Sequence, residues 1–324
     1  MEDEMTVNLD VDRPDFIGGS DMAALLGISK WTTPLQVFHE KTRSPLFVKQ
    51  EKSVFQRGKR WEEPALLMLL DLLEEQDGER PAVTGRNFRY FDIEFPFLSC
   101  EVDFEMLHLG EPFNGEIKTV NIFSSNEWGE KGDEQVPAYY LAQSQWGMGI
   151  TGSKQQMLGA LFGADSILPF MIERDDETIA AMRQVAIDFW NDHVLKDIPP
   201  PPTTLDDMDM VLRGLRGRPV ELPAEMADKL QEIKSIRQSA KAAAMREGEL
   251  KFEVYDFIRA AWQAPNDTSL DEKAILRVDG QDIATLNTQT QTRIDVDALR
   301  KNEPAIAAKY SKENVFRSLR FKKI

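Results

Sequence analysis

The chain has 324 residues, a formal net charge of −16 and an apolar fraction of 42%, which together predict a globular protein with a sizeable core. It contains one cysteine and three scattered histidines, so it excludes a disulfide framework and shows no zinc-binding pattern. The acidic N-terminus lacks the basic segment of a signal peptide, and the apolar runs are too short to span a bilayer. We therefore expect a cytoplasmic protein with no membrane partner.

The net charge is distributed unevenly along the chain. Residues 1–210 carry a net charge of −20, whereas residues 211–324 carry a net charge of +4. An acidic surface commonly serves solubility, and it argues against a nucleic-acid partner unless a basic groove or bound metal ions face the phosphates.

Hydrophobic periodicity, glycine and proline predict the following elements in chain order. Helices are expected at residues 22–26, 34–41, 54–75, 137–149 and 177–195. Strands are expected at residues 83–91, 97–106, 113–120, 156–161 and 166–172. This order predicts a mixed α/β core in which helices flank a small mixed sheet.

A run of four prolines at residues 199–202 interrupts regular structure and predicts a domain boundary. We expect a core domain over residues 1–202 and a mainly helical extension over residues 203–324. The extension is predicted to contain a long helix at 223–261, a hairpin that turns at Asp279-Gly280, a helix at 296–310 and a basic end with Arg317, Arg320, Lys322 and Lys323.

Two of the predicted strands carry residues with an evident chemistry. In a strand, Glu116 and Lys118 point to one side while Ile117 points to the other. Asp103 lies in the preceding apolar run, which we expect to be the central strand, and an unpaired buried carboxylate is costly. Two carboxylates beside an ammonium suit a hard cation such as Mg²⁺ and a water that attacks a phosphodiester. A structural ion pair between Glu116 and Lys118 remains an alternative.

Further features occur around these strands in a specific order. They are the turn Gly18-Gly19-Ser20, the helical segment Gly58-Lys59-Arg60-Trp61-Glu62, the helical segment Tyr140-Leu141-Ala142-Gln143-Ser144-Gln145 and the strand end Ile172-Glu173-Arg174-Asp175. Together with Asp103 and Glu116-Ile117-Lys118, this arrangement resembles the YqaJ and lambda-exonuclease family of phage recombination nucleases, a branch of the PD-(D/E)XK superfamily. The resemblance covers residues 13–195.

The resemblance implies a role for each matching residue. Asp103 and Glu116 would bind Mg²⁺, for which Mn²⁺ could substitute, with the backbone carbonyl of Ile117 as a further ligand. Glu62 would help to position a second ion. Lys118 would orient the attacking water and stabilise charge on the phosphate, and Gln143 would support the lysine or the nucleophile. Arg13 and Ser20 have the separation of the family residues that contact the 5′-phosphate of the DNA end.

The family also implies an activity and partners. The chain would be a Mg²⁺-dependent exonuclease that digests linear double-stranded DNA from 5′ to 3′. It would leave 3′ overhangs for a phage single-strand annealing protein. Relatives form a homotrimeric ring, and the protein would come from a phage or prophage in a bacterial host.

One departure from the family keeps alternatives open. The family usually has Ser-Pro-Asp-Gly at the first carboxylate, whereas this chain reads Cys100-Glu101-Val102-Asp103-Phe104. Glu101 lies on the same strand face and is a substitute ligand. The alternatives are a PD-(D/E)XK endonuclease of the RecB or restriction type, or a degenerate nuclease fold that only binds DNA or protein. Ser20 is equally well explained as a helix N-cap.

Overall fold

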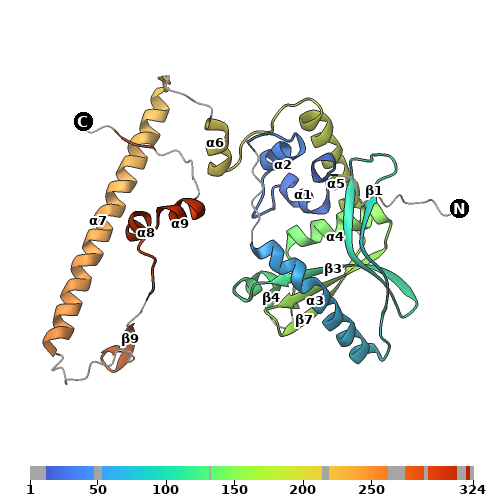
Figure 1. Cartoon of the computed structure of the whole chain (residues 1–324), viewed down its shortest axis with the longest axis horizontal. Coiled ribbons are helices and arrows are strands. Elements are labelled where there is room, and N and C mark those ends of the chain that lie inside the picture. The colour runs from blue at the N-terminus through green and yellow to red at the C-terminus, as the bar shows by residue number, and fades with distance from the viewer. Residues whose placement is uncertain are drawn as a thin grey trace. The chain divides into compact units, whose positions relative to one another are not determined.

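The computed structural model describes residues 12–46, 53–130, 133–213, 219–261, 274–287, 291–311 and 319–321. The chain divides into two compact units, Met1–Gly214 and Leu215–Ile324 (Figure 1). Of the predicted basic end, Arg317, Lys322 and Lys323 lie outside the described residues.

The first unit is built on a five-stranded sheet with the strand order β1-β2-β3-β6-β7. Its strands are β1 (Ala82–Phe91), β2 (Ser99–His108), β3 (Glu111–Val120), β6 (Gln155–Phe162) and β7 (Ser166–Glu173). The pair β3 and β6 is parallel, and the other pairs are antiparallel. The mixed α/β fold class is therefore confirmed. The middle strand is β3 and not the strand of Asp103, because β6 adds to β3 in parallel and extends the sheet beyond it.

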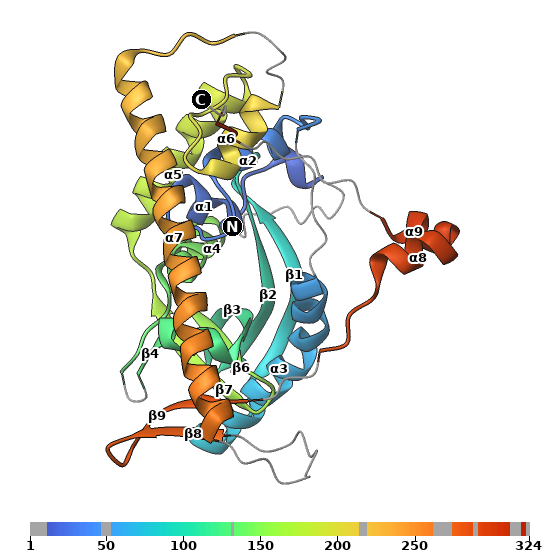
Figure 2. The same cartoon turned by 90° about the vertical axis from the view of Figure 1, so that its left-hand side faces the viewer.

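Helices cover both faces of this sheet (Figure 2). On one face, α3 (Ser53–Asp77) packs Leu66 and Leu69 against apolar side chains of β2, β3 and β6. On the other face, α4 (Ala138–Thr151) packs Trp146 beside α1 (Gly19–Leu25), α2 (Pro34–Lys41) and α5 (Asp176–Phe189). The shorter elements are η1 (Arg13–Asp15), η2 (Ile122–Trp128), β4 (Gly129–Glu130), β5 (Asp133–Glu134), η3 (Trp190–Val194) and α6 (Leu205–Leu212).

Helix α1 begins earlier than predicted, and its N-cap is Gly18 rather than Ser20. The carboxylate of Asp21 accepts a hydrogen bond from the backbone N–H of Gly18 at 2.9 Å, which satisfies a donor that the helix leaves unpaired. The interpretation of Ser20 as an N-cap is therefore wrong, and its hydroxyl is free to take part in another contact.

Helix α6 was not predicted from the sequence and lies beyond the four prolines. Its residue Asp207 is fully buried and accepts hydrogen bonds from the hydroxyl of Thr33 at 2.8 Å and from the backbone N–H of Thr203 at 2.9 Å. These bonds attach α6 to the start of α2. The structure divides the chain at Gly214, and the domain boundary at residue 202 stays a prediction.

The second unit contains a long helix, a hairpin and two short helices. These are α7 (Ala224–Ala261), β8 (Ala274–Val278), β9 (Gln281–Leu286), α8 (Val296–Asn302) and α9 (Pro304–Tyr310). The hairpin turn is confirmed, with positive φ angles of 51° at Asp279 and 81° at Gly280. The single helix predicted at 296–310 is wrong, because the residue before a proline avoids the helical region and Glu303 has φ −133°.

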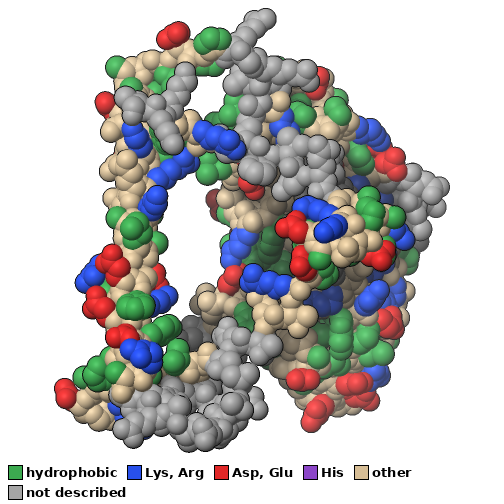
Figure 3. Space-filling model, turned by 60° about the vertical axis from the view of Figure 1, so that its left-hand side comes forward, with side chains coloured by type: hydrophobic (Ala, Val, Ile, Leu, Met, Phe, Trp, Pro, Cys, Tyr) green, Lys and Arg blue, Asp and Glu red, His purple; other side chains and the backbone are tan. Residues whose placement is uncertain are grey.

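The surface of α7 carries many apolar side chains in contact with solvent (Figure 3). Among the described residues of the second unit, none is buried. The described helices also include none that is long and apolar enough to cross a membrane.

Candidate functional site

The site forms where β2 and β3 stop pairing. Their ladder ends at Phe104 and Gly115, although β2 continues beside β1 to Ser99 and β3 continues beside β6 to Val120. Asp103 directly precedes Phe104, outside the ladder, and its Oδ2 accepts a hydrogen bond from the backbone N–H of Ile117 at 2.8 Å. This bond satisfies a strand N–H that β2 no longer pairs. It also fixes the direction of Asp103 without the Pro-Asp-Gly turn.

Glu116 is the centre of the hydrogen-bond network at this opening. It is 6% exposed, and its Oε1 accepts hydrogen bonds from the Nζ of Lys118 and, at 2.7 Å, from the Nε2 of Gln143. Gln143 comes from α4, whereas Ile117 points to the opposite face and packs in the core under α3. The predicted alternation of Glu116, Ile117 and Lys118 therefore holds in the structure.

The charges of these groups interact strongly because the groups are buried. Burial, followed by the negative charge of Asp103, raises the pKa of Glu116 to about 7. Burial also raises the pKa of Asp103. For Lys118, burial acts to lower the pKa, but the charges of Glu116 and Asp103 outweigh it and raise the pKa. Lys118 therefore carries a positive charge at neutral pH.

Glu62 reaches the same region from α3. Its carboxylate lies 4.0 Å from the guanidinium of Arg86, a residue of β1. Burial, followed by the charge of Asp103, raises the pKa of Glu62. Arg86 also forms an ion pair with Glu63. Arg86 was not predicted from the sequence, because only the pairing of β1 with β2 places it opposite Phe104 and beside these carboxylates.

Arg13 and Ser20, the two residues predicted to contact a 5′-phosphate, contact each other in the structure. A guanidinium nitrogen of Arg13 donates to the Oγ of Ser20 at 3.0 Å and to Asp21 at 2.5 Å. Asp21 also accepts a salt bridge at 2.9 Å from Lys41, whose side chain is completely buried. These ion pairs hold the guanidinium of Arg13 in place beside the Ser20 hydroxyl.

One cavity of about 110 Å³ joins the two groups of residues. Its lining includes five predicted site residues, namely Arg13, Ser20, Asp103, Glu116 and Gln143. Asn114 and Gln156 also line it and were not predicted; they face each other only because β3 and β6 pair in parallel. Glu62 and Lys118 lie outside this lining.

The donor chemistry of the site fits a hard cation in part. Asp103, Glu116 and Glu62 offer only oxygen ligands, and their raised pKa values show a concentration of negative charge that a cation would relieve. Among the described residues, however, no three Asp, Glu, His or Cys side chains gather closely enough to hold an ion by themselves. Glu101 also lines this cavity, but its side chain is 62% exposed and forms an ion pair with Arg89.

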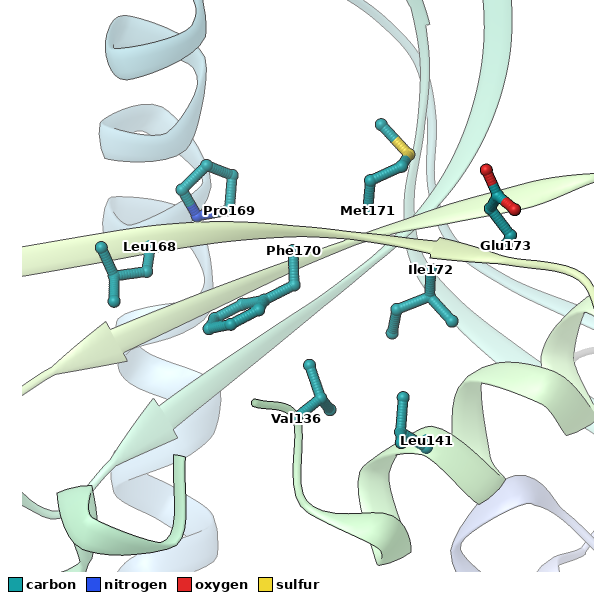
Figure 4. A pocket seen from close by; sticks show the side chains of 8 residues that line it. All are labelled: Val136, Leu141, Leu168, Pro169, Phe170, Met171, Ile172 and Glu173. Atoms are coloured by element: carbon teal, nitrogen blue, oxygen red, sulfur yellow. The ribbon is translucent and has the colours of Figure 1, made fainter. Parts of the chain in front are cut away.

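A second and larger hollow of about 630 Å³ lies elsewhere, along the edge strand β7. Figure 4 shows Leu168, Phe170 and Ile172 pointing to the same side as Val136 and Leu141. Of the eight residues that line this hollow, only Glu173 is charged. None of the eight is a predicted site residue. The smaller cavity is therefore the better candidate for chemistry, because it combines buried charge with hydrogen-bond donors.

Comparisons with known proteins show what this chain is similar to. Residues 11–154 match the family model described as the YqaJ-like viral recombinase domain. The chain is 25% identical over 327 residues to the uncharacterized protein YqaJ of Bacillus subtilis (strain 168), over 97% of this chain and 93% of the relative.

Two solved structures are also similar to this chain. One is an alkaline exonuclease (LHK-Exo) from Laribacter hongkongensis, with 18% identity, a TM-score of 0.46 and coverage of 57% of this chain and 91% of that one. The other is a phage related exonuclease from Haemophilus somnus 129PT, with 16% identity, a TM-score of 0.39 and coverage of 56% and 96%.

Proposed function

We propose that this chain is a phage-type nuclease, because residues 11–154 match the model of the YqaJ-like viral recombinase domain. In its specific form, the proposal is a Mg²⁺-dependent exonuclease that digests linear double-stranded DNA from 5′ to 3′ and leaves 3′ single-stranded overhangs. Its place of action would be the cytoplasm of a bacterial host.

One observation carries the proposal. The buried carboxylate of Glu116 is bound by Lys118 and Gln143, stands across the strand opening from Asp103, and shares a cavity with the Arg13 and Ser20 pair. A solvated surface ion pair would have neither this burial nor the neighbouring carboxylate. The arrangement supports hydrolysis of a phosphodiester, since that reaction needs an oriented water and a cation beside the phosphate.

The residues divide this chemistry between them. The ammonium of Lys118 would orient the attacking water and stabilise the negative charge that develops on the phosphate oxygens. Gln143 would hold the Glu116 carboxylate in place through its amide N–H. Asp103 and Glu116, with the backbone carbonyl of Ile117, would hold Mg²⁺ or Mn²⁺, and Glu62 would help to hold a second ion. When bound, these ions would activate a water and neutralise charge on the attacking and leaving oxygens.

The part of the cavity that Arg13 and Ser20 line favours binding of a DNA end over binding of the interior of a duplex. Arg13 and Ser20 present a guanidinium and a hydroxyl, which are suitable donors for a terminal phosphate. This supports an exonuclease over an endonuclease.

Digestion of a linear duplex labelled separately at each end tests the activity and its direction. With Mg²⁺, we expect early release of the 5′-terminal label, late release of the 3′ label, and slower digestion when the 5′-phosphate is absent. Closed circular DNA should remain intact. Cleavage of the circle would favour the endonuclease alternative, and release of the 3′ label first would contradict the proposed direction.

Substitution of the two carboxylates tests the site itself. We expect Asp103→Ala and Glu116→Ala each to lower Mg²⁺-dependent digestion by at least about 10³-fold, because each would weaken metal binding and transition-state stabilisation. Glu101→Ala, on the same strand, should retain most of the activity. Full digestion by both folded variants, or its loss only in Glu101→Ala, would rule out the assigned site.

The partners follow from the same proposal. We propose that the 3′ overhangs are passed to a single-strand annealing protein and that the chain acts as a homotrimer. The mass of the assembly in solution, measured by light scattering, tests the trimer.

A further inference from the structure

An exposed tryptophan stands close to Lys118. Trp31 lies in the loop between α1 and α2 and is 57% exposed, whereas Trp128 and Trp146 are each 2% exposed. The loop is tied to Ser29, whose hydroxyl accepts hydrogen bonds from the backbone N–H groups of Trp31 and Thr32 at 3.2 and 3.1 Å. The exposed ring is therefore carried on a fixed segment of backbone.

The Trp31 ring is supported by two tyrosines of α4. Its centroid lies 5.0 Å from the Tyr139 ring in an edge-to-face contact and 6.5 Å from the Tyr140 ring at an interplanar angle of 34°. Tyr139 is itself held, because its hydroxyl donates to Glu127 at 2.7 Å and the Lys30 ammonium lies 5.5 Å from its ring. Ring contacts of this kind hold the Trp31 side chain in place, and 57% of its surface is still exposed.

Tyr140 connects this aromatic group to the candidate active site. The Nζ of Lys118 lies 5.2 Å from the centre of the Tyr140 ring, and the same Nζ binds Glu116. A chain of direct contacts therefore runs from Trp31 through Tyr140 to the ammonium that would face the phosphate.

From this arrangement, and on the basis of the proposed nuclease function, we propose that Trp31 is the stacking platform for a base of the strand that is being digested. The occupant is a nucleobase of one of the two nucleotides at the 5′ end. Every base has a flat π-face, so such a platform holds the strand without selecting a sequence. Lys30, which lies over the Tyr139 ring and forms a salt bridge with Glu127, and Lys118, which lies over the Tyr140 ring, place positive charge beside the phosphates that flank such a base.

The experiment uses the full chain and duplexes that carry the fluorescent base 2-aminopurine at the first or the second 5′ nucleotide. Binding is measured in Ca²⁺ without Mg²⁺, so that the readout does not require cleavage. We expect the wild-type chain to quench at least one of the two probes by stacking. Trp31→Ala should restore the emission of that probe and weaken binding about tenfold, whereas Trp31→Phe should keep most of the quenching.

Ile93→Ala is the matched control, because Ile93 is also a large exposed apolar residue, at 76% exposure, in the first unit. It should behave as the wild type. Equal emission of both probes in the wild-type and Trp31→Ala complexes would overturn the proposal. A change in self-association of Trp31→Ala with unchanged quenching would also overturn it, since it would identify a second copy as the occupant.

The failure of this proposal differs from the failure of the nuclease function. If the wild-type chain digests linear duplex DNA and Trp31→Ala does so with an unchanged KM, the platform alone is wrong. If the wild-type chain neither binds nor digests DNA, the nuclease function is wrong. With the platform present, Trp31→Ala should raise KM more than it lowers kcat, because stacking holds the strand without taking part in bond cleavage.

Discussion

In the first unit, α3 sends Leu66 and Leu69 into a closed core with exposures of 2% and 0%, whereas in the second unit α7 leaves Phe252 and Phe257 exposed at 71% and 75%. Both helices carry apolar side chains, yet only α3 has a sheet to cover them. Apolar periodicity therefore predicts that a segment is helical, but it does not predict that the apolar face is buried. Burial requires a second surface that covers this face. Among the described residues, the buried side chains and the candidate site both lie in the first unit.

The charged side chains follow the same contrast. Asp21, Arg13 and Lys41 form a buried network in the first unit, whereas the pair of Glu247 and Lys251 on α7 is exposed to solvent. Solvent screens the exposed pair, but removal of one partner from a buried network leaves an uncompensated charge. The comparison can therefore be tested by equivalent changes in the two units.

The largest effect on stability is expected from Asp21→Asn. This change removes the anion that lies between Arg13 and the fully buried Lys41, and it should lower the free energy of unfolding of the first unit by about 3–5 kcal/mol. Glu247→Gln on α7 is the control and should cause no measurable change. Urea unfolding of both variants tests this, and an equal response in the two units would break the comparison.

The same residue predicts a dependence of stability on pH. Burial acts to raise the pKa of Asp21, but the charges of Arg13 and Lys41 outweigh it and lower the pKa below its ordinary value of 3.8. Because the pKa is lower in the folded state, the stabilisation is present above about pH 3.8 and is lost as the pH falls through the folded value. In Asp21→Asn, the free energy of unfolding should therefore no longer show this decrease at acidic pH, as urea unfolding at a series of pH values would measure.

Replacement of glycine by alanine is expected to change stability by a smaller amount, with a loss in the first unit and a gain in the second. A Cβ at Gly115 would lie 1.9 Å from Cζ of Phe104, so Gly115→Ala should destabilise the first unit by about 1–3 kcal/mol or more. Gly248 lies within α7 with no atom within 4 Å of an added Cβ, so Gly248→Ala should stabilise the helix by about 1 kcal/mol. Thermal unfolding followed by circular dichroism measures both signs. Destabilisation by both changes would contradict the view that α7 is unpacked at this position.

The smallest effect concerns catalysis after removal of the second unit. A chain that ends at residue 214 retains every proposed site residue and the whole core of the first unit. It should digest short duplexes at close to the full rate but release fewer nucleotides per binding event on long DNA, because the second unit would help to guide DNA or to dock a partner. Product lengths after single encounters measure this. Unchanged processivity would show that the second unit has another role.

The sequence by itself determined the local features of this protein. Alternation in β3 placed Glu116 and Lys118 on one side, because side chains of a strand alternate regardless of its neighbours. The Asp279-Gly280 turn was also predictable, because a two-residue hairpin turn requires positive φ angles that these residues adopt readily. The family resemblance followed from such local motifs in a fixed order.

Only the tertiary structure decided how those features meet. The parallel pairing of β6 with β3 made β3 the middle strand and brought Gln156 beside Asn114. The ladder between β2 and β3 ends at Phe104, so that Asp103, the residue before it, can accept a hydrogen bond from the N–H of Ile117. No pattern around Asp103 in the sequence indicated this bond. The physical reason is that strand pairing and ladder ends depend on contacts between distant segments, whose energies are not encoded in the local periodicity of either segment.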